Sequence, residues 1–197
     1  MKKILALSAS PSKGWNSDSM LDQFIDGAKE IDGVEIEKIY VIDLPVLPYS
    51  FENREPDPQK EPEFCAFIDK FKAANGIVIA TPTYNFGVPG SLKNLIDRLS
   101  PLCLNYSKLN SFGQPTGLLG DKIVFSLISG GTPNFIKSLL WFWFPAVWFS
   151  GIWWYFGAKN LGHVYGGGLK KDHRAQDDIT LMQRCRLAGK DFARALV

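Results

Sequence analysis

The residues from Gly76 to Leu99 constrain the fold of this chain more than any other stretch. Gly76–Ala80 is a short, unbroken apolar run, which is typical of a strand covered on both faces. Apolar residues then recur with the spacing of one helix face, at Leu92, Leu95, Ile96 and Leu99. Pro89 suits the first turn of that helix, where a missing N–H loses no partner. The stretch therefore predicts a strand, a loop and a helix, with the loop at the carboxyl end of a parallel strand, where open α/β sheets bind ligands.

The remainder of the chain repeats this alternation of strands and helices. Four further strands are predicted at Lys2–Ala9, Val34–Val41, Asp121–Ser129 and around Leu161–Tyr165. Three further helices are predicted at Ser17–Ile31, Glu63–Ala74 and Ile179–Leu196. Asp43–Pro62 is predicted to be a long loop and Cys103–Gly120 a looser segment. The alternation predicts one flavodoxin-like domain over residues 1–197, a three-layer α/β/α fold with a five-stranded parallel sheet of order 2-1-3-4-5.

The loop between the strand and the helix of the first stretch carries side chains suited to a flat ligand with polar edges. Tyr84 and Phe86 offer aromatic surface. Asn85 and Gly87 can present amide groups and tolerate unusual backbone angles. Pro82 fixes the exit from the strand. Proline, asparagine and glycine are also ordinary turn residues, so a bare connection stays open as an alternative on these residues alone.

The segment after the first predicted strand has the composition of an anion-binding loop. Its hydroxyl and amide donors are Ser10, Ser12, Ser17, Ser19 and Asn16. The helix that starts near Ser17 would point its N-terminal N–H groups at a negative charge, and Gly14 relieves backbone crowding. The segment lacks GxxxxGK[ST], which argues against a nucleoside triphosphate. The alternative is a plain serine-rich loop in which Ser17 caps the helix.

A third loop begins at Ser129, where another predicted strand ends. Gly130 and Gly131 would let the backbone approach a planar ligand, although two glycines after a strand usually form only a turn. A flavodoxin-like site requires ligand-binding loops after the first, third and fourth strands of the sheet. The three loops together therefore favour one ligand site over three unrelated turns.

Two of these loops resemble those of the NAD(P)H-dependent FMN reductase and quinone reductase superfamily. The pattern Pro-x-Tyr-Asn-x-x-x-Pro-x-x-Leu-Lys-x-x-Ile-Asp is present as Pro82, Tyr84, Asn85, Pro89, Leu92, Lys93, Ile96 and Asp97. Ser10-Pro11 followed by Ser17-x-Ser19 resembles the phosphate loop of the same family, although many members carry arginine at the position of Ser12. The resemblance implies that FMN is held by Ser10, Ser12, Asn16, Ser17, Ser19, Pro82, Thr83, Tyr84, Asn85, Phe86, Gly87, Ser129, Gly130 and Gly131.

The resemblance also implies an enzyme that passes electrons from NADH or NADPH through FMN to a small acceptor, such as a quinone, a free flavin, an azo compound or a metal oxyanion. It implies no catalytic acid, base or nucleophile, because the flavin carries the chemistry. Tyr84, Asn85 and Phe86 would hold the edge of the ring, and Lys13 is a further candidate for the phosphate. Two other classes stay open: a flavodoxin-type electron carrier that does not oxidise nicotinamide, and a binding module that has lost the flavin. Flavodoxin carriers are usually strongly acidic, whereas this chain has a net charge of +2.

Charge and cysteine content argue against several other partners. With 22 basic and 20 acidic residues, nothing in the net charge favours nucleic acid. Cys65, Cys103 and Cys185 are far apart and have no metal-ligand spacing, which argues against an iron–sulfur cluster or another metal centre and favours free thiols in a reducing cytoplasm. The basic cluster from Lys170 to Arg174 could meet a cofactor phosphate, but a solvated surface is the favoured interpretation.

Residues 138–158 contain no charged residue and five of the six tryptophans. The run is long enough to be considered as a membrane span, but Pro145 and Gly151 interrupt it, and a span would separate two strands of one sheet. Three interpretations remain: a subunit interface or substrate-pocket wall, internal packing, or contact with a membrane surface. We favour the first, and with it a homodimer or homotetramer assembled through residues 138–158.

Overall fold

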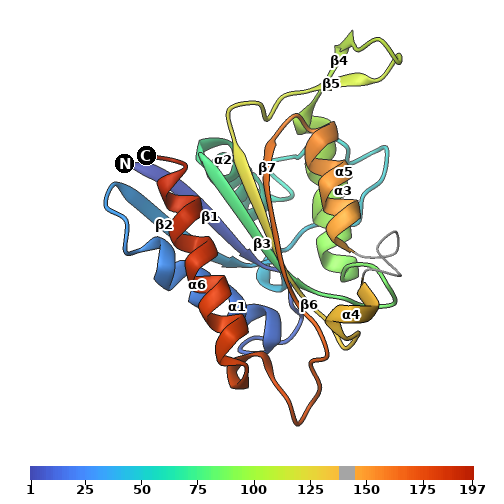
Figure 1. Cartoon of the computed structure of the whole chain (residues 1–197). Coiled ribbons are helices and arrows are strands. Elements are labelled where there is room, and N and C mark those ends of the chain that lie inside the picture. Colours follow the sequence, from blue (N-terminus) through green and yellow to red (C-terminus); the bar gives the residue numbers. More distant parts are fainter. Residues whose placement is uncertain (138–144) are drawn as a thin grey trace.

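The computed structural model describes residues 1–137 and 145–197. Five parallel strands form its main sheet: β1 (Lys2–Ser8), β2 (Val34–Tyr40), β3 (Gly76–Pro82), β6 (Ile123–Ser129) and β7 (Lys159–Gly166). Their order across the sheet is β2-β1-β3-β6-β7 (Figure 1). This order confirms the predicted flavodoxin-like arrangement 2-1-3-4-5.

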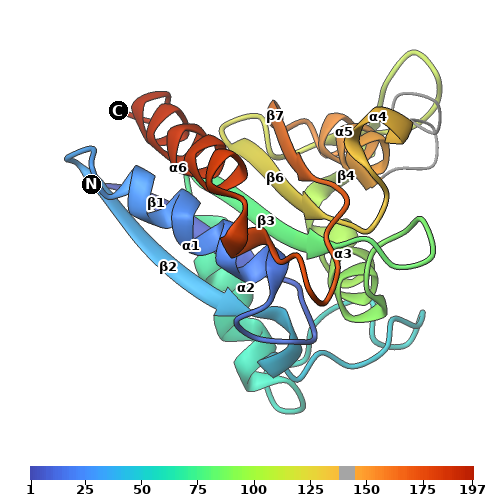
Figure 2. The ribbon, with the colours of Figure 1, turned by 60° about the horizontal axis from the view of Figure 1, so that its bottom comes forward.

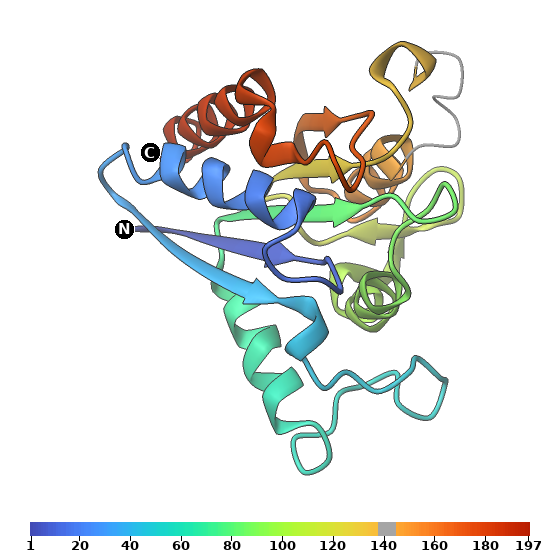
Figure 3. The same ribbon diagram turned by 90° about the horizontal axis from the view of Figure 1, so that it is seen from below.

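Helices cover both faces of the sheet (Figure 3). The helices α1 (Asn16–Ala28) and α6 (Ile179–Arg194) pack on one face, and α2 (Pro62–Ala73), α3 (Gly90–Cys103) and α5 (Pro145–Tyr155) pack on the other. Within β1, Ile4 and Ala6 join the first layer, whereas Leu5 and Leu7 join the second. This alternation explains why the strands have unbroken apolar runs: each side chain has a helix to pack against, whichever way it points.

The segment predicted to be looser contains a small antiparallel hairpin that the sequence analysis missed. It consists of β4 (Leu104–Leu109) and β5 (Pro115–Gly117), and Figure 1 shows it projecting from one end of the molecule. Most of β4 is exposed, so its side chains carry no apolar alternation. In the described part of the chain, the other elements without a prediction are α4 (Asn134–Lys137), α5 within the tryptophan-rich run, and the 3₁₀ turns η1 (Val41–Asp43) and η3 (Ala175–Asp177).

The tryptophan-rich run is only partly covered by the structure, because residues 138–144 lie outside the described residues. In the described part, α5 packs against β6 and β7 and buries Phe149 and Trp153 in the core. Trp154 lies on the outer face of α5, with 68% of its surface exposed. Internal packing, the less favoured interpretation, therefore accounts for the inner face of α5. Among the described residues, no helix is both long and apolar enough to cross a membrane.

Candidate functional site

The loops after β1, β3 and β6 meet at the carboxyl edge of the sheet (Figure 3). Backbone hydrogen bonds join them directly. The N–H of Ala9 donates to the carbonyl of Ala80 (2.8 Å), and the N–H of Thr83 donates to the carbonyl of Ser129 (2.7 Å). The predicted residues of all three loops are therefore brought to one edge of the sheet.

The loop after β3 turns sharply at Tyr84–Gly87. Tyr84 and Gly87 exchange two backbone hydrogen bonds, of 3.1 and 2.8 Å, and the residues between them have positive φ angles: +49° at Asn85 and +64° at Phe86. Two successive positive φ angles are typical of a type I′ turn. The left-handed angles thus fall on Asn85 and Phe86 rather than on Gly87, and phenylalanine rarely adopts them. The turn leaves the rings of Tyr84 and Phe86 about half exposed, at 46% and 56%.

Next to this turn lie a buried hydroxyl, that of Thr83, and a tightly packed glycine, Gly130. Thr83 Oγ1 is buried and has no hydrogen-bond partner in the part of the chain that the structure describes. A Cβ on Gly130 would come within 2.8 Å of Tyr165 Oη and 3.2 Å of Thr83 Oγ1. Tyr165 Oη donates to the carbonyl of Thr132 (2.9 Å), and burial raises the pKa of the Tyr165 phenol, which keeps it a donor. Gly131 meets no such crowding, since its nearest atom would be the Leu169 carbonyl at 3.7 Å.

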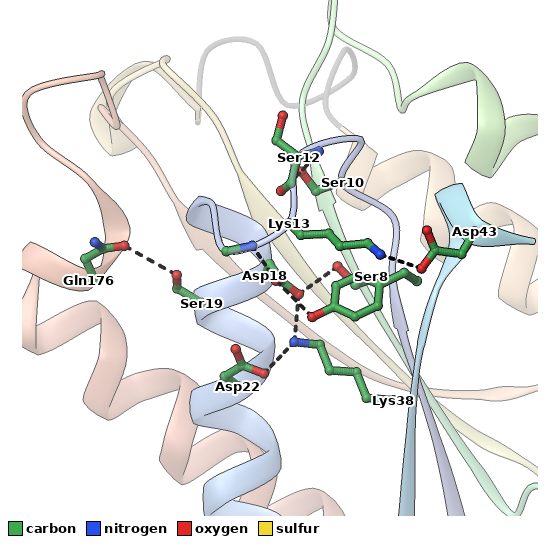
Figure 4. A network of polar contacts seen from close by, with 12 residues as sticks. Ser8, Ser10, Ser12, Lys13, Asp18, Ser19, Asp22, Lys38, Asp43 and Gln176 are labelled. Carbon is green, nitrogen blue, oxygen red and sulfur yellow. Dashed lines mark hydrogen bonds and ion pairs between the residues drawn. The ribbon is translucent and has the colours of Figure 1, made fainter.

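Some of the hydrogen-bond donors predicted in the loop after β1 bond within the loop itself. Helix α1 begins at Asn16 with Trp15 as its N-cap, so the expectation that Ser17 caps the helix is wrong: Ser17 lies inside the first turn and is buried. Ser10 Oγ accepts from the Ser12 N–H (3.1 Å) and donates to the Ser12 carbonyl (2.9 Å) (Figure 4). The Ser10 hydroxyl therefore stabilises the backbone conformation of the loop that leads into α1.

The loop after β7 reaches across to the start of α1, which the sequence analysis did not predict. Asn16 Oδ1 accepts from the Ala175 N–H (2.9 Å), and Ser19 Oγ lies 3.4 Å from Gln176 Oε1 (Figure 4). Two of the predicted donor residues thus have partners from a segment about 160 residues further along the chain. Neither contact has a local sequence signal, because both depend on the order of the strands.

Asp18, in the first turn of α1, is a second feature that could not be predicted from the sequence. Its side chain is 2% exposed and accepts hydrogen bonds from Ser8 Oγ (2.8 Å) and the Gly14 N–H (2.7 Å). Lys38 Nζ lies 2.8 Å from Asp18 Oδ1 and 2.6 Å from Asp22 Oδ1 (Figure 4). Burial alone would raise the pKa of Asp18, but the hydrogen bonds from Lys38, Gly14 and Ser8 outweigh it and lower the pKa.

The lowered pKa of Asp18 predicts a loss of stability in acid. The carboxylate stabilises the folded state fully above its unfolded pKa of about 3.9, and this contribution disappears as the pH falls through the folded value. Urea unfolding between pH 7 and pH 3 should therefore show a larger fall in stability for the wild type than for Asp18→Asn, in which only the other carboxyl groups with lowered pKa values, such as Glu30 and Asp57, contribute. The exposed Asp172 serves as control, since Asp172→Asn should leave the acid profile of the wild type in place. An unchanged acid profile in Asp18→Asn would contradict the assignment.

The three cysteines do not form a cluster. All are free, and no group of three or more histidine, cysteine or acidic residues within the described ranges could hold a metal ion. Cys103 and Cys185 are buried, and burial raises the pKa of each thiol to about 12. At neutral pH both thiols are protonated, so they contribute to the core rather than to nucleophilic chemistry.

Comparison with known protein families identifies one match. A family model described as NADPH-dependent FMN reductase matches residues 2–135. The match spans the loops after β1, β3 and β6 and ends before the tryptophan-rich run.

Individual relatives agree with this match. An FMN-dependent NADH:quinone oxidoreductase of Mycoplasma pneumoniae is 33% identical over 138 residues, which cover 68% of this chain and 70% of the relative. An iron-sulfur flavoprotein of Methanosarcina thermophila is 28% identical over 145 residues, with 70% of each chain covered. The structure of an FMN-dependent NADH-azoreductase from Bacillus anthracis in complex with FMN superimposes with a TM-score of 0.75, covering 98% of this chain and 100% of that chain at 20% identity.

Proposed function

This chain belongs to the NADPH-dependent FMN reductase family, and from that premise we propose that it binds FMN across the loops after β1, β3 and β6. It is an oxidoreductase that uses NADH or NADPH as electron donor. The observation that carries the proposed site is the junction of the three loops, where the buried Thr83 hydroxyl lacks a partner among the described residues and packs, with Tyr165 Oη, against the bare backbone of Gly130. An unpaired buried hydroxyl is costly unless a ligand completes its hydrogen bonds.

The residues present fit FMN in three respects. The exposed rings of Tyr84 and Phe86 offer apolar surface beside the Asn85 amide, as the edge of a flavin ring requires. Because Gly130 and Gly131 have no side chains, a planar group can approach their backbone closely. The N-terminus of α1 offers backbone N–H groups and a positive dipole end to the phosphate.

When bound, FMN supplies the hydride and electron transfer between the nicotinamide and the acceptor. The chain itself binds the flavin and fixes its orientation. The type I′ turn at Tyr84–Gly87 fixes the ring edge, and the Thr83 hydroxyl donates a hydrogen bond towards the ligand. Because Tyr84 and Phe86 stay half exposed, a second flat molecule can reach the same place from solvent. We propose a quinone as the acceptor class, supported by the quinone oxidoreductase among the relatives.

Flavin absorbance tests this function directly. The purified protein, or the apo protein after addition of FMN, should show flavin bands that NADH or NADPH bleaches under anaerobic conditions and a quinone restores. A flavin that binds but resists bleaching would favour the electron carrier. A preparation that stays colourless and fails to bind added FMN would refute the proposal.

The crowding at Gly130 gives a matched pair of variants. Gly130→Ala should weaken FMN binding about tenfold, equivalent to about 1.4 kcal/mol, because the new methyl group displaces Tyr165 Oη and Thr83 Oγ1 from the ligand side. Gly120→Ala should bind FMN like the wild type, since its methyl group meets only an ordinary contact at 3.9 Å and lies at the opposite end of β6 from the candidate loop. Titration of the apo proteins by quenching of FMN fluorescence measures both. Equal affinities for the two variants would show that Gly130 does not border the ligand.

We also propose that two or four copies assemble through the tryptophan-rich run and that the protein works in a reducing compartment such as the cytoplasm. The exposed Trp154 supports the first proposal, and the three free cysteines support the second. Light scattering of the wild type and of Trp154→Glu should distinguish an assembled species from a smaller one. A monomeric wild type would contradict the assembly.

A further inference from the structure

We propose that Arg174, from the loop after β7, supplies the fixed positive charge that holds the phosphate of FMN at the start of α1. This inference rests on the proposed function, because it assigns a phosphate-binding residue to the same site. It assigns a role to one member of the basic cluster for which the sequence favoured a solvated surface.

The loop before α1 has no uncommitted lysine of its own. Lys13 forms an ion pair with Asp43 (2.6 Å), and its ammonium group lies 4.6 Å from the centre of the Tyr40 ring. Lys38 is paired with both Asp18 and Asp22. A phosphate carries up to two negative charges, and the charge of Lys38 is already offset by Asp18, so a further cation near this turn would favour the anion.

Arg174 lies against this loop through two contacts. Its Nη2 donates to the carbonyl of Gly14 (2.8 Å), and its guanidinium carbon lies 4.6 Å from the centre of the Trp15 ring. The hydrogen bond between Ala175 and Asn16 holds the same segment in place. Figure 2 shows the loop after β7 running beside the start of α1. Gly14 and Trp15 directly precede the first helical residue, Asn16, so both contacts place the guanidinium group against the chain at the start of α1.

The guanidinium group of Arg174 has a hydrogen-bond donor without an acceptor among the described residues. Arg174 Nε is buried and has no hydrogen-bond partner, and none of the ion pairs among the described residues involves Arg174. A buried N–H without an acceptor calls for one, and arginine matches the oxygens of phosphate in both charge and geometry. The aromatic contact with Trp15 further limits the guanidinium orientation before any ligand binds.

Riboflavin separates a phosphate contact from a structural role, because it shares the ring of FMN but lacks the phosphate. Affinities of the apo protein for both flavins should be measured by fluorescence quenching. We expect Arg174→Gln to weaken FMN at least tenfold and riboflavin less than twofold, and Arg174→Lys to fall between wild type and Arg174→Gln for FMN. The FMN affinity of the wild type should also decline more steeply with added sodium chloride than that of Arg174→Gln.

Lys171→Gln is the matched control, since it removes the same charge from an exposed position in the same loop and should leave both affinities within twofold. Equal losses for FMN and riboflavin in Arg174→Gln would overturn the proposal in favour of a structural strut, and unchanged FMN affinity would overturn it outright. If Arg174→Gln does not fold, Arg174→Lys carries the same comparison. A wild type that binds neither flavin would refute the FMN site itself, whereas a wild type that binds FMN with no preference over riboflavin would refute only the role of Arg174.

Discussion

Replacing Arg98 by methionine is expected to lower the free energy of unfolding by about 3–5 kcal/mol, the range for a buried ion pair that loses one partner. Arg98 is fully buried in α3, and its Nη2 lies 2.5 Å from Oε2 of Glu61, whose side chain is 2% exposed. The guanidinium group also lies over the Phe64 ring, at 4.9 Å from its centre. Methionine would leave the Glu61 carboxylate buried without a counter-charge, with only the Leu47 N–H still donating to it (3.1 Å).

Three further variants identify the cause of that loss: Glu61→Gln, its combination with Arg98→Met, and Lys93→Met. The double variant Arg98→Met with Glu61→Gln should be less destabilised than the sum of the two single variants, because no charge is left uncompensated. Lys93→Met is the control on the same helix: its ion pair with Asp97 is exposed, so the loss should stay below about 0.5 kcal/mol. Urea unfolding measures all five proteins: the wild type, the three single variants and the double variant. If Arg98→Met loses less than about 1 kcal/mol, the pair does not have the role assigned here.

The same ion pair connects the long loop before α2 to the helix that follows the candidate ring-binding turn. Asn94 of α3 accepts from the Tyr49 N–H (2.8 Å) and donates to the Leu47 carbonyl (3.1 Å), one turn before Arg98. We therefore expect the backbone amides of residues 44–61 to exchange with solvent faster in Arg98→Met than in the wild type. The proline-containing loop predicted from the sequence is thus joined to α3 through the buried Arg98–Glu61 pair and through Asn94.

The parts of the fold that could be predicted from the sequence are those with a periodic pattern. The strand Gly76–Ala80 and the helix with Leu92 and Leu95 appear in the structure as β3 and α3. Strand order followed from the alternation of strands and helices, because that arrangement favours a parallel sheet with one switch point. The three candidate loops met as expected, since the carboxyl ends of parallel strands lie at one edge of the sheet.

Other features had no local pattern to reveal them. The β4–β5 hairpin is mostly exposed and short, so neither apolar alternation nor length marked it. Asp18 was not singled out in the sequence, and Arg174 was assigned to a solvated surface. Only the folded chain buries the first and brings the second to the start of α1. Asn85 was expected to tolerate unusual backbone angles, but the positive φ at Phe86 was hidden, because phenylalanine is a poor predictor of a left-handed turn.

The close packing of α1 on α6 leads to the second large prediction. A Cβ added to Gly189 in α6 would lie 1.9 Å from the carbonyl oxygen of Phe24 in α1, and one added to Gly27 in α1 would lie 1.9 Å from that of Arg186. Backbone atoms cannot rotate away as a side chain can, so the two helices must separate. We expect Gly189→Ala to lose about 3 kcal/mol of unfolding free energy, at the upper end of the usual range for overpacking. Thermal or urea unfolding measures the loss.

Gly151→Ala in α5 is the matched control, because a Cβ there meets no atom within 4 Å. Alanine forms helix better than glycine, so this variant should gain about 0.5–1 kcal/mol, opposite in sign to Gly189→Ala. The separation of α1 from α6 also has a functional consequence. It moves the loop that carries Arg174 away from the loop that carries Gly14, so Gly189→Ala should lose FMN affinity more than riboflavin affinity. A variant as stable as Gly151→Ala would show that the helices can part without cost, and that this packing does not hold the phosphate end of the site.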